Sequence, residues 1–175
     1  MLKRRSFMAA AGVALGCLMA LPAQAQEAVK IGLVLPMTGP FASTGRQVEA
    51  GVRAYMALNG DEAAGKKIEI VLRDDAGTAD QTRRIAQELV VNEGVSILMG
   101  FGLTPLAMSV APVLNQAKIP AIITSATTSA IMPQSEYFVR TSMGGPQSAV
   151  PVATWAVEND LKRVVTLVTD YGPGH

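Results

Sequence analysis

The stretch Val29–Leu35 (VKIGLVL) and the loop 36–45 (PMTGPFASTG) decide the fold of this chain. A run of apolar, partly β-branched residues that stops at a proline predicts a buried β-strand. After the glycine-, proline- and hydroxyl-rich loop, apolar residues recur at the spacing of one helix face: Val48, Val52, Tyr55 and Met56. A buried strand that leads into an amphipathic helix is the first half of a βαβ unit.

The same alternation continues to the end of the chain. Further strands are expected at 67–73, 95–99, 119–123, 137–141 and 163–169, with helix-length segments between them and a last helix from about 146 to 159. This order predicts an α/β fold with a mostly parallel, Rossmann-like sheet. No helix follows the last expected strand, so we expect the chain to be the front part of a longer protein.

Two of the expected helices begin with recognisable start signals. Thr78 and Gln81 have the spacing of a capping box, in which each side chain bonds a free backbone N–H of the first turn. Thr104 before Pro105 is expected to be a plain N-cap, because proline suits the first helical position.

Residues 1–25 are expected to be a signal peptide. They have a basic start, an apolar run from Phe7 to Leu21, and a small-x-small cleavage site at Ala23–Ala25. The pair Arg4–Arg5 leaves the Sec and twin-arginine export routes both open. Cys17, the only cysteine, lies inside this leader, and a lipoprotein site there is the less favoured alternative. The product is therefore expected in the periplasm.

The composition argues against nucleic-acid binding and against most catalytic chemistry. Without the three basic residues of the leader, 12 basic and 14 acidic residues remain, which leaves no cationic surface. The segment Gly100–Gly102 begins like a dinucleotide motif, but Pro105 replaces the third glycine. The segment 60–67 resembles a P-loop without its Ser/Thr. The only histidine is His175, and Asp74–Asp75 fit a turn, so we expect neither an enzyme nor a cofactor nor a metal.

Three loops are the candidate ligand site: Thr38–Gly45, Gly100–Thr104 and Thr124–Ala130. Ligands of open α/β sheets bind beyond the carboxyl ends of the strands, where these loops converge. They carry hydroxyl groups, glycines that permit close approach, and a helix N-terminus that suits a carboxylate. Each hydroxyl taken singly is explained equally well as a turn or a cap.

Several long stretches resemble one family of receptors: VKIGLVLPMTGPFASTGRQVEAGVRAYMALNG, IEIVLRDDAGTADQTRRIAQELVVNEGVSILMGFG, SEYFVRTS and VVTLVTDYGPG. They are similar to the type I periplasmic binding proteins, in the branch of the Leu/Ile/Val-binding proteins of ABC transporters. The resemblance implies two lobes that close around a small ligand, with lobe 1 at 26–142 and the start of lobe 2 at 143–175. It also implies that an inner-membrane ABC permease is the partner.

Carried over from this family, the ligand contacts fall on Thr44, Leu103, Thr104, Ser125, Thr127 and Tyr171. Thr44 stands where leucine-type receptors carry a tyrosine, and Thr104 where the family often has serine. The implied ligand is an amino acid or another small carboxylate, and receptors of this branch also bind aromatic carboxylates, amides and urea. A sensor domain of a signalling protein and an exported α/β enzyme are the alternatives of other classes.

Overall fold

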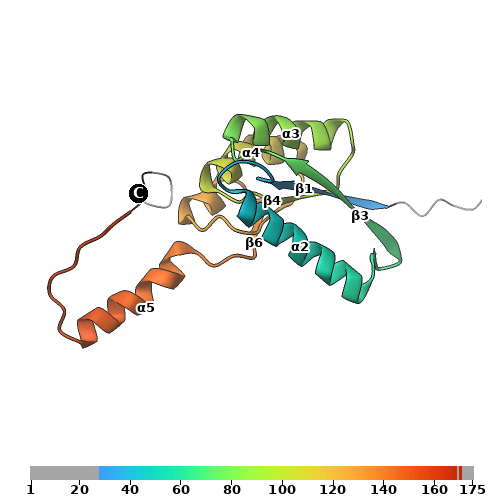
Figure 1. The fold of residues 1–175 in the computed structure, drawn as a ribbon. Helices are drawn as coiled ribbons and strands as arrows, with labels where there is room; N and C mark the ends of the chain where they lie inside the picture. Colours follow the sequence, from blue (N-terminus) through green and yellow to red (C-terminus); the bar gives the residue numbers. More distant parts are fainter. Residues whose placement is uncertain (1–27, 169, 171–175) are drawn as a thin grey trace, which may run out of the picture.

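The computed structural model describes residues 28–168 and 170, which contain a six-stranded sheet in the order β2-β3-β1-β4-β5-β6 (Figure 1). All neighbouring strands are parallel except β2 and β3. The mostly parallel α/β fold predicted from the sequence is therefore confirmed. The strands are β1 (Val29–Leu35), β2 (Glu62–Ala63), β3 (Lys66–Asp74), β4 (Ile97–Gly100), β5 (Ala121–Ile123) and β6 (Phe138–Arg140).

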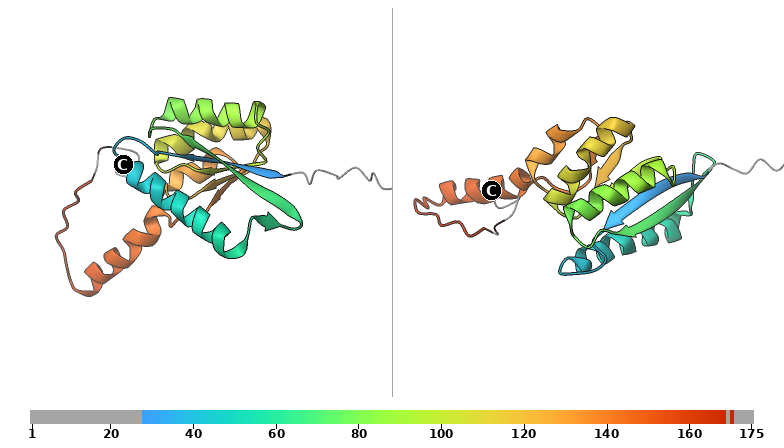
Figure 2. Two further views of the ribbon diagram at one scale, coloured as in Figure 1. Left: turned by 45° about the vertical axis from the view of Figure 1, so that its right-hand side comes forward. Right: turned by 90° about the horizontal axis from the view of Figure 1, so that it is seen from above.

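Helices cover the two faces of the sheet unequally. Two of them lie on one face and a single helix lies on the other, as the two views of Figure 2 show. The pair consists of α3 (Ala79–Val91) and α4 (Thr104–Ala117), and the single helix is α2 (Ala42–Asn59). A short 3-10 helix, η2 (Ser129–Gln134), follows β5.

The main core lies between the sheet and the α3–α4 pair. The periodic positions of both helices point into it, and Leu89, Val110 and Leu114 have no exposed surface. Gly32 lets α3 approach the sheet closely, because a Cβ at this position would lie 2.8 Å from the side chains of Leu89 and Leu98. On the other face of the sheet, Val48, Val52 and Met56 of α2 are half-buried as expected from their spacing, but Tyr55 is 69% exposed.

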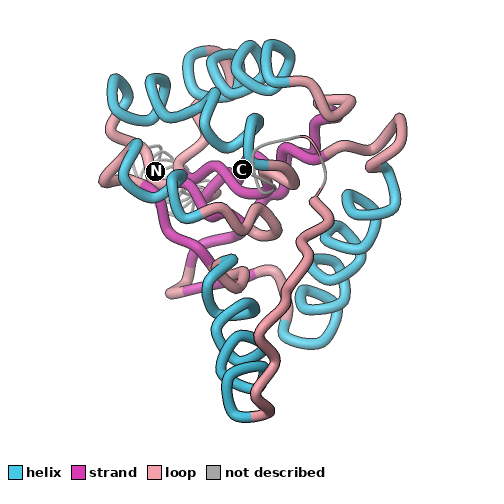
Figure 3. Tube along the Cα trace, turned by 90° about the vertical axis from the view of Figure 1, so that its left-hand side faces the viewer, coloured by secondary structure: helices cyan, strands magenta, loops and turns pink. Residues whose placement is uncertain are grey.

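The last helix, α5 (Gly145–Glu158), stands outside these layers (Figure 3). The chain leaves the sheet after Arg140, and none of the residues of α5 is buried. In the part of the chain that the structure describes, no helix is long and apolar enough to cross a membrane.

The expected strand at 163–169 is wrong for the residues that the structure describes. Residues 161–168 are extended without strand pairing, and Val165 and Leu167 are 95% and 100% exposed. A strand requires a neighbour that takes up its backbone N–H and C=O groups. No described strand lies beside this segment, and Thr169 lies outside the described residues.

The sequence did not predict β2 or η2. The P-loop-like segment forms a tight hairpin between β2 and β3, and the two residues at its tip, Ala64 and Gly65, have φ angles of 51° and 73°. Two consecutive positive φ angles are typical of a type I′ turn. The two residues of β2 form a strand only by pairing with the start of β3, so the sequence pattern of β2 alone does not predict it.

The expected side-chain cap bonds are absent at both helices, although Thr78 is an N-cap residue as predicted. At α3, Thr78 is the N-cap residue but makes no side-chain cap bond, and Gln81 Nε2 donates to the carbonyl oxygen of Asp74 at 3.2 Å. The hydroxyl of Thr78 donates instead to the carbonyl of Asp75. At α4 the N-cap is Leu103, while Thr104 is already helical and uses its hydroxyl in a tertiary contact.

Candidate functional site

Loops that follow β1, β4 and β5 meet at the carboxyl edge of the sheet, as the sequence predicts. Thr104 Oγ1, in the first turn of α4, lies 2.7 Å from Thr128 Oγ1 in the loop after β5. Thr44, in the first turn of α2, lies beside the loop after β4, because its Cγ2 is 4.0 Å from where a Cβ on Gly102 would be. Threonine side chains from three separate segments thus lie at one edge of the sheet.

Two glycines make this close convergence possible. Gly100 has a φ of +125°, and a Cβ there would lie 2.0 Å from the carbonyl oxygen of Val34. A Cβ on Gly45 would lie 2.2 Å from the carbonyl oxygen of Pro36. Both distances are far below contact, so only glycine lets α2 and β4 approach the end of β1.

Asp74, the last residue of β3, fixes the loop after β1. Its Oδ1 accepts hydrogen bonds from the backbone N–H groups of Met37 (2.8 Å) and Ala76 (2.8 Å), and its Oδ2 accepts one from Thr38 Oγ1 (2.7 Å). Partial burial acts to raise the pKa of Asp74, but the bonds from Thr38, Ala76 and Met37 outweigh it and lower this pKa below 3.8. The ionised carboxylate therefore holds the loop in place.

Asp75 is completely buried and shapes the turn before α3. It accepts hydrogen bonds from the N–H of Gly77 at 2.9 Å and from Thr82 Oγ1 at 3.1 Å. Burial raises the pKa of Asp75 despite these bonds, and the neighbouring Asp74 charge adds to the rise. The predicted turn role of both acids is confirmed, and the described residues contain no group of three or more His, Cys, Asp or Glu suited to a metal ion.

The other expected contact residues occupy different surroundings. Thr104 is only 2% exposed, whereas Thr44, Ser125 and Thr127 are half-buried at the edge. The side chain of Leu103 turns towards Gly77, with its Cδ1 4.0 Å from where a Cβ on that glycine would be. Tyr171 lies outside the described residues.

The sequence placed Thr128 in a candidate loop without singling it out, and it assigned no role to Arg140. Thr128 carries the hydroxyl that pairs with Thr104, whereas Thr127, its neighbour, contributes a carbonyl that accepts from Arg140 Nη1 at 2.7 Å. One signal was available for Arg140. It is the last residue but one of the expected strand 137–141, and the end of a parallel strand lies at the edge of the sheet where ligands of such folds bind.

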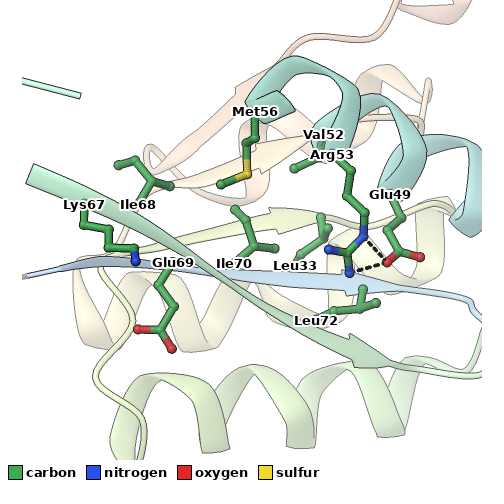
Figure 4. Close-up of a pocket in the computed structure, with 10 residues that line it drawn as sticks. All are labelled: Leu33, Glu49, Val52, Arg53, Met56, Lys67, Ile68, Glu69, Ile70 and Leu72. Carbon is green, nitrogen blue, oxygen red and sulfur yellow. Dashed lines mark hydrogen bonds and ion pairs between the residues drawn. The ribbon is translucent and has the colours of Figure 1, made fainter. Parts of the chain in front are cut away.

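Two hollows lie elsewhere, on the α2 face of the sheet. One of about 360 Å³ separates α2 from β3 (Figure 4), and one of about 540 Å³ lies between α2 and β1. Aliphatic side chains such as Val52, Ile68 and Ile70 form most of their walls. Arg53 and Glu49 at the rim form an ion pair with each other, with 2.6 Å between Nη2 and Oε1. Neither hollow is lined by Thr104, Thr128 or another residue of the loop edge.

Comparison with known proteins points to one group of receptors. A family model described as periplasmic binding protein matches residues 28–175. The chain is 44% identical over 150 residues to Leu/Ile/Val-binding protein homolog 6 of Brucella abortus (strain 2308), a match that covers 85% of this chain and 38% of the relative.

Two crystal structures extend the comparison. A solute-binding protein of an ABC transporter from Rhodopseudomonas palustris BisB5, in complex with 3,4-dihydroxybenzoic acid, has 48% identity and a TM-score of 0.82, over 84% of this chain and 40% of that chain. Another from R. palustris, in complex with 4-hydroxybenzoate, has 40% identity and a TM-score of 0.80, over 85% and 40%. The chain thus spans about two fifths of the length of these relatives.

Proposed function

Because the chain belongs to the periplasmic binding protein family, we propose that it forms the first lobe, and the start of the second, of a solute receptor. We place lobe 1 at 26–142 and the start of lobe 2 at 143–175. The end of β6 at Arg140 and the absence of buried residues in α5 support this boundary. The receptor would reach the periplasm through the signal peptide 1–25, by the Sec or the twin-arginine route, and deliver its ligand to an ABC permease in the inner membrane.

The proposed ligand is a small aromatic carboxylate. The observation that carries this proposal is the edge where the N-terminus of α4 meets the hydroxyl pair of Thr104 and Thr128. Free N–H groups of a first helical turn and neutral hydroxyls are suitable donors for a carboxylate. The two R. palustris relatives were crystallised with such acids.

A branched-chain amino acid is the second candidate, favoured by the name of the Brucella relative. Its ammonium group would need a carboxylate partner. The two acids at this edge of the described structure, Asp74 and Asp75, already accept the hydrogen bonds of their turns. Lobe 1 therefore favours a ligand whose only charge is the carboxylate.

Ligand binding would work by lobe closure. The open and closed arrangements exchange in solution, and a ligand that contacts both lobes shifts the population towards the closed one. In this proposal lobe 1 binds the carboxylate, and lobe 2 closes over the rest of the ligand.

Titration calorimetry of the full-length protein tests the proposal directly. We expect heat of binding with 4-hydroxybenzoate or 3,4-dihydroxybenzoate, and much weaker binding of L-leucine and L-valine. Thr104→Val should lower the affinity for the aromatic acid by about tenfold, because a hydrogen bond to a charged group is worth roughly 1.5 kcal/mol or more. Binding of L-leucine with no response to either acid would favour the amino-acid receptor instead.

A further inference from the structure

Arg140, at the end of β6, grips the loop after β5 with both arms of its guanidinium group. Nη1 donates to the carbonyl oxygen of Thr127 at 2.7 Å, and Nη2 donates to that of Thr128 at 3.1 Å. A planar guanidinium presents its donors in a fixed fork, so two adjacent carbonyls are held in one relative orientation. The backbone beneath the Thr128 hydroxyl is thereby fixed.

The same two carbonyls accept a second hydrogen bond each. The N–H of Gly145, the first residue of α5, donates to Thr127 at 2.9 Å, and the N–H of Ile131 in η2 donates to Thr128 at 3.3 Å. The crossover to α5 also passes close to the guanidinium, because a Cβ on Gly144 would lie 3.7 Å from Arg140 Nη1. The carbonyl of Thr127 thus joins three segments: β6, the start of α5, and its own loop after β5, which we call the ligand loop.

We infer that Arg140 is a positioning residue that sets the ligand loop and the first turn of α5 in one common arrangement. This inference rests on the proposed function, because it gives the junction a role in ligand affinity. Displacing the loop would move Thr128 away from Thr104, and it would also release the N–H of Gly145 at the entry to lobe 2. The contacts of Arg140 therefore fix two things together: the position of the loop after β5 in lobe 1, and the direction in which α5 starts lobe 2.

Amide hydrogen exchange of the ligand-free, full-length protein tests the junction without any ligand. Arg140→Gln should speed amide exchange at Gly145 and Ile131 by about tenfold or more. The carbonyls that accept hydrogen bonds from these two amides are no longer fixed by the guanidinium group. The matched control is Arg73→Gln, which removes another half-buried strand arginine, bonded to Leu72 and Glu93. The control should leave both amides unchanged. Unaltered exchange in Arg140→Gln, with a folded α3–α4 core, would overturn the inference.

The affinity for 4-hydroxybenzoate, measured by calorimetry, separates positioning from charge. Arg140→Gln and Arg140→Lys should both weaken binding by about tenfold or more, because lysine keeps the charge but lacks the planar fork. Wild-type affinity in Arg140→Lys would mean that the charge acts on the ligand directly, which contradicts a positioning role. If the wild-type protein binds neither aromatic acids nor amino acids, the proposed function fails, while the exchange data still decide whether the junction exists.

Discussion

The hydroxyl oxygens of Thr104 and Thr128 lie 2.7 Å apart and join the start of α4 to the loop after β5. The two residues are 24 positions apart in the sequence. Only a parallel sheet that puts both loops at one edge brings them together. This pair satisfies the hydroxyl of Thr104, which is almost completely buried and lies inside the first turn of α4.

A double-mutant cycle measures the strength of this pair. Thr104→Val and Thr128→Val should each lower the free energy of unfolding by about 1 kcal/mol, the usual net value of one hydrogen bond. The double variant should lose less than the sum of the two, with a coupling of roughly 0.5–1 kcal/mol. Urea unfolding of the four proteins provides the values. Strict additivity would show that the two hydroxyls do not interact.

Asp74 should make the protein less stable in acid. Its folded-state pKa lies below 3.8, so its contribution is fully present above that value and is lost as the pH falls through the lowered pKa. The stability advantage of the wild type over Asp74→Asn should therefore stay constant near neutral pH and shrink as the pH falls below about 4. Glu69→Gln, which removes an exposed carboxylate of the same strand, is the control for the loss of one surface charge. An advantage that does not change with pH would contradict the assignment.

Asp75 should show the opposite dependence. Burial raises its folded-state pKa above 3.8, so the folded protein favours the protonated carboxyl. Its contribution is greatest below 3.8 and declines as the pH rises through the raised pKa. Compared with Asp75→Asn, the wild type should thus lose relative stability between about pH 3 and pH 6. Thermal unfolding of both proteins across this range is the measurement, and a rising advantage of the wild type would refute it.

Gly100→Ala should strongly destabilise the protein. The new methyl group would meet the carbonyl of Val34 at 2.0 Å, and the φ of +125° is itself unfavourable for alanine. We expect a loss of roughly 2–4 kcal/mol in the free energy of unfolding.

The matched control for this prediction is Gly51→Ala in α2. No atom lies within 4 Å of its added methyl group, so the higher helix propensity of alanine should stabilise the protein by up to about 1 kcal/mol. Urea unfolding of both variants should therefore give opposite signs. Equal effects would show that the backbone of Gly100 relaxes freely.

The sequence by itself determined the alternation of strands and helices as far as α5, and most of the side chains that face the sheet. These features are local, because a period of two or of 3.6 residues decides which side chains share a face. Family likeness followed from the same stretches, and the match to residues 28–175 confirms it.

Only the tertiary structure decided which polar groups pair across that edge. Thr104 was expected to cap its own helix, but its hydroxyl bonds Thr128, and Gln81 bonds the end of β3 instead of closing a capping box. A polar side chain has several partners of similar energy, and the folded backbone selects among them. The extended segment at 161–168 has the composition of a strand but no described partner, because strand formation is a property of the pair and not of one segment.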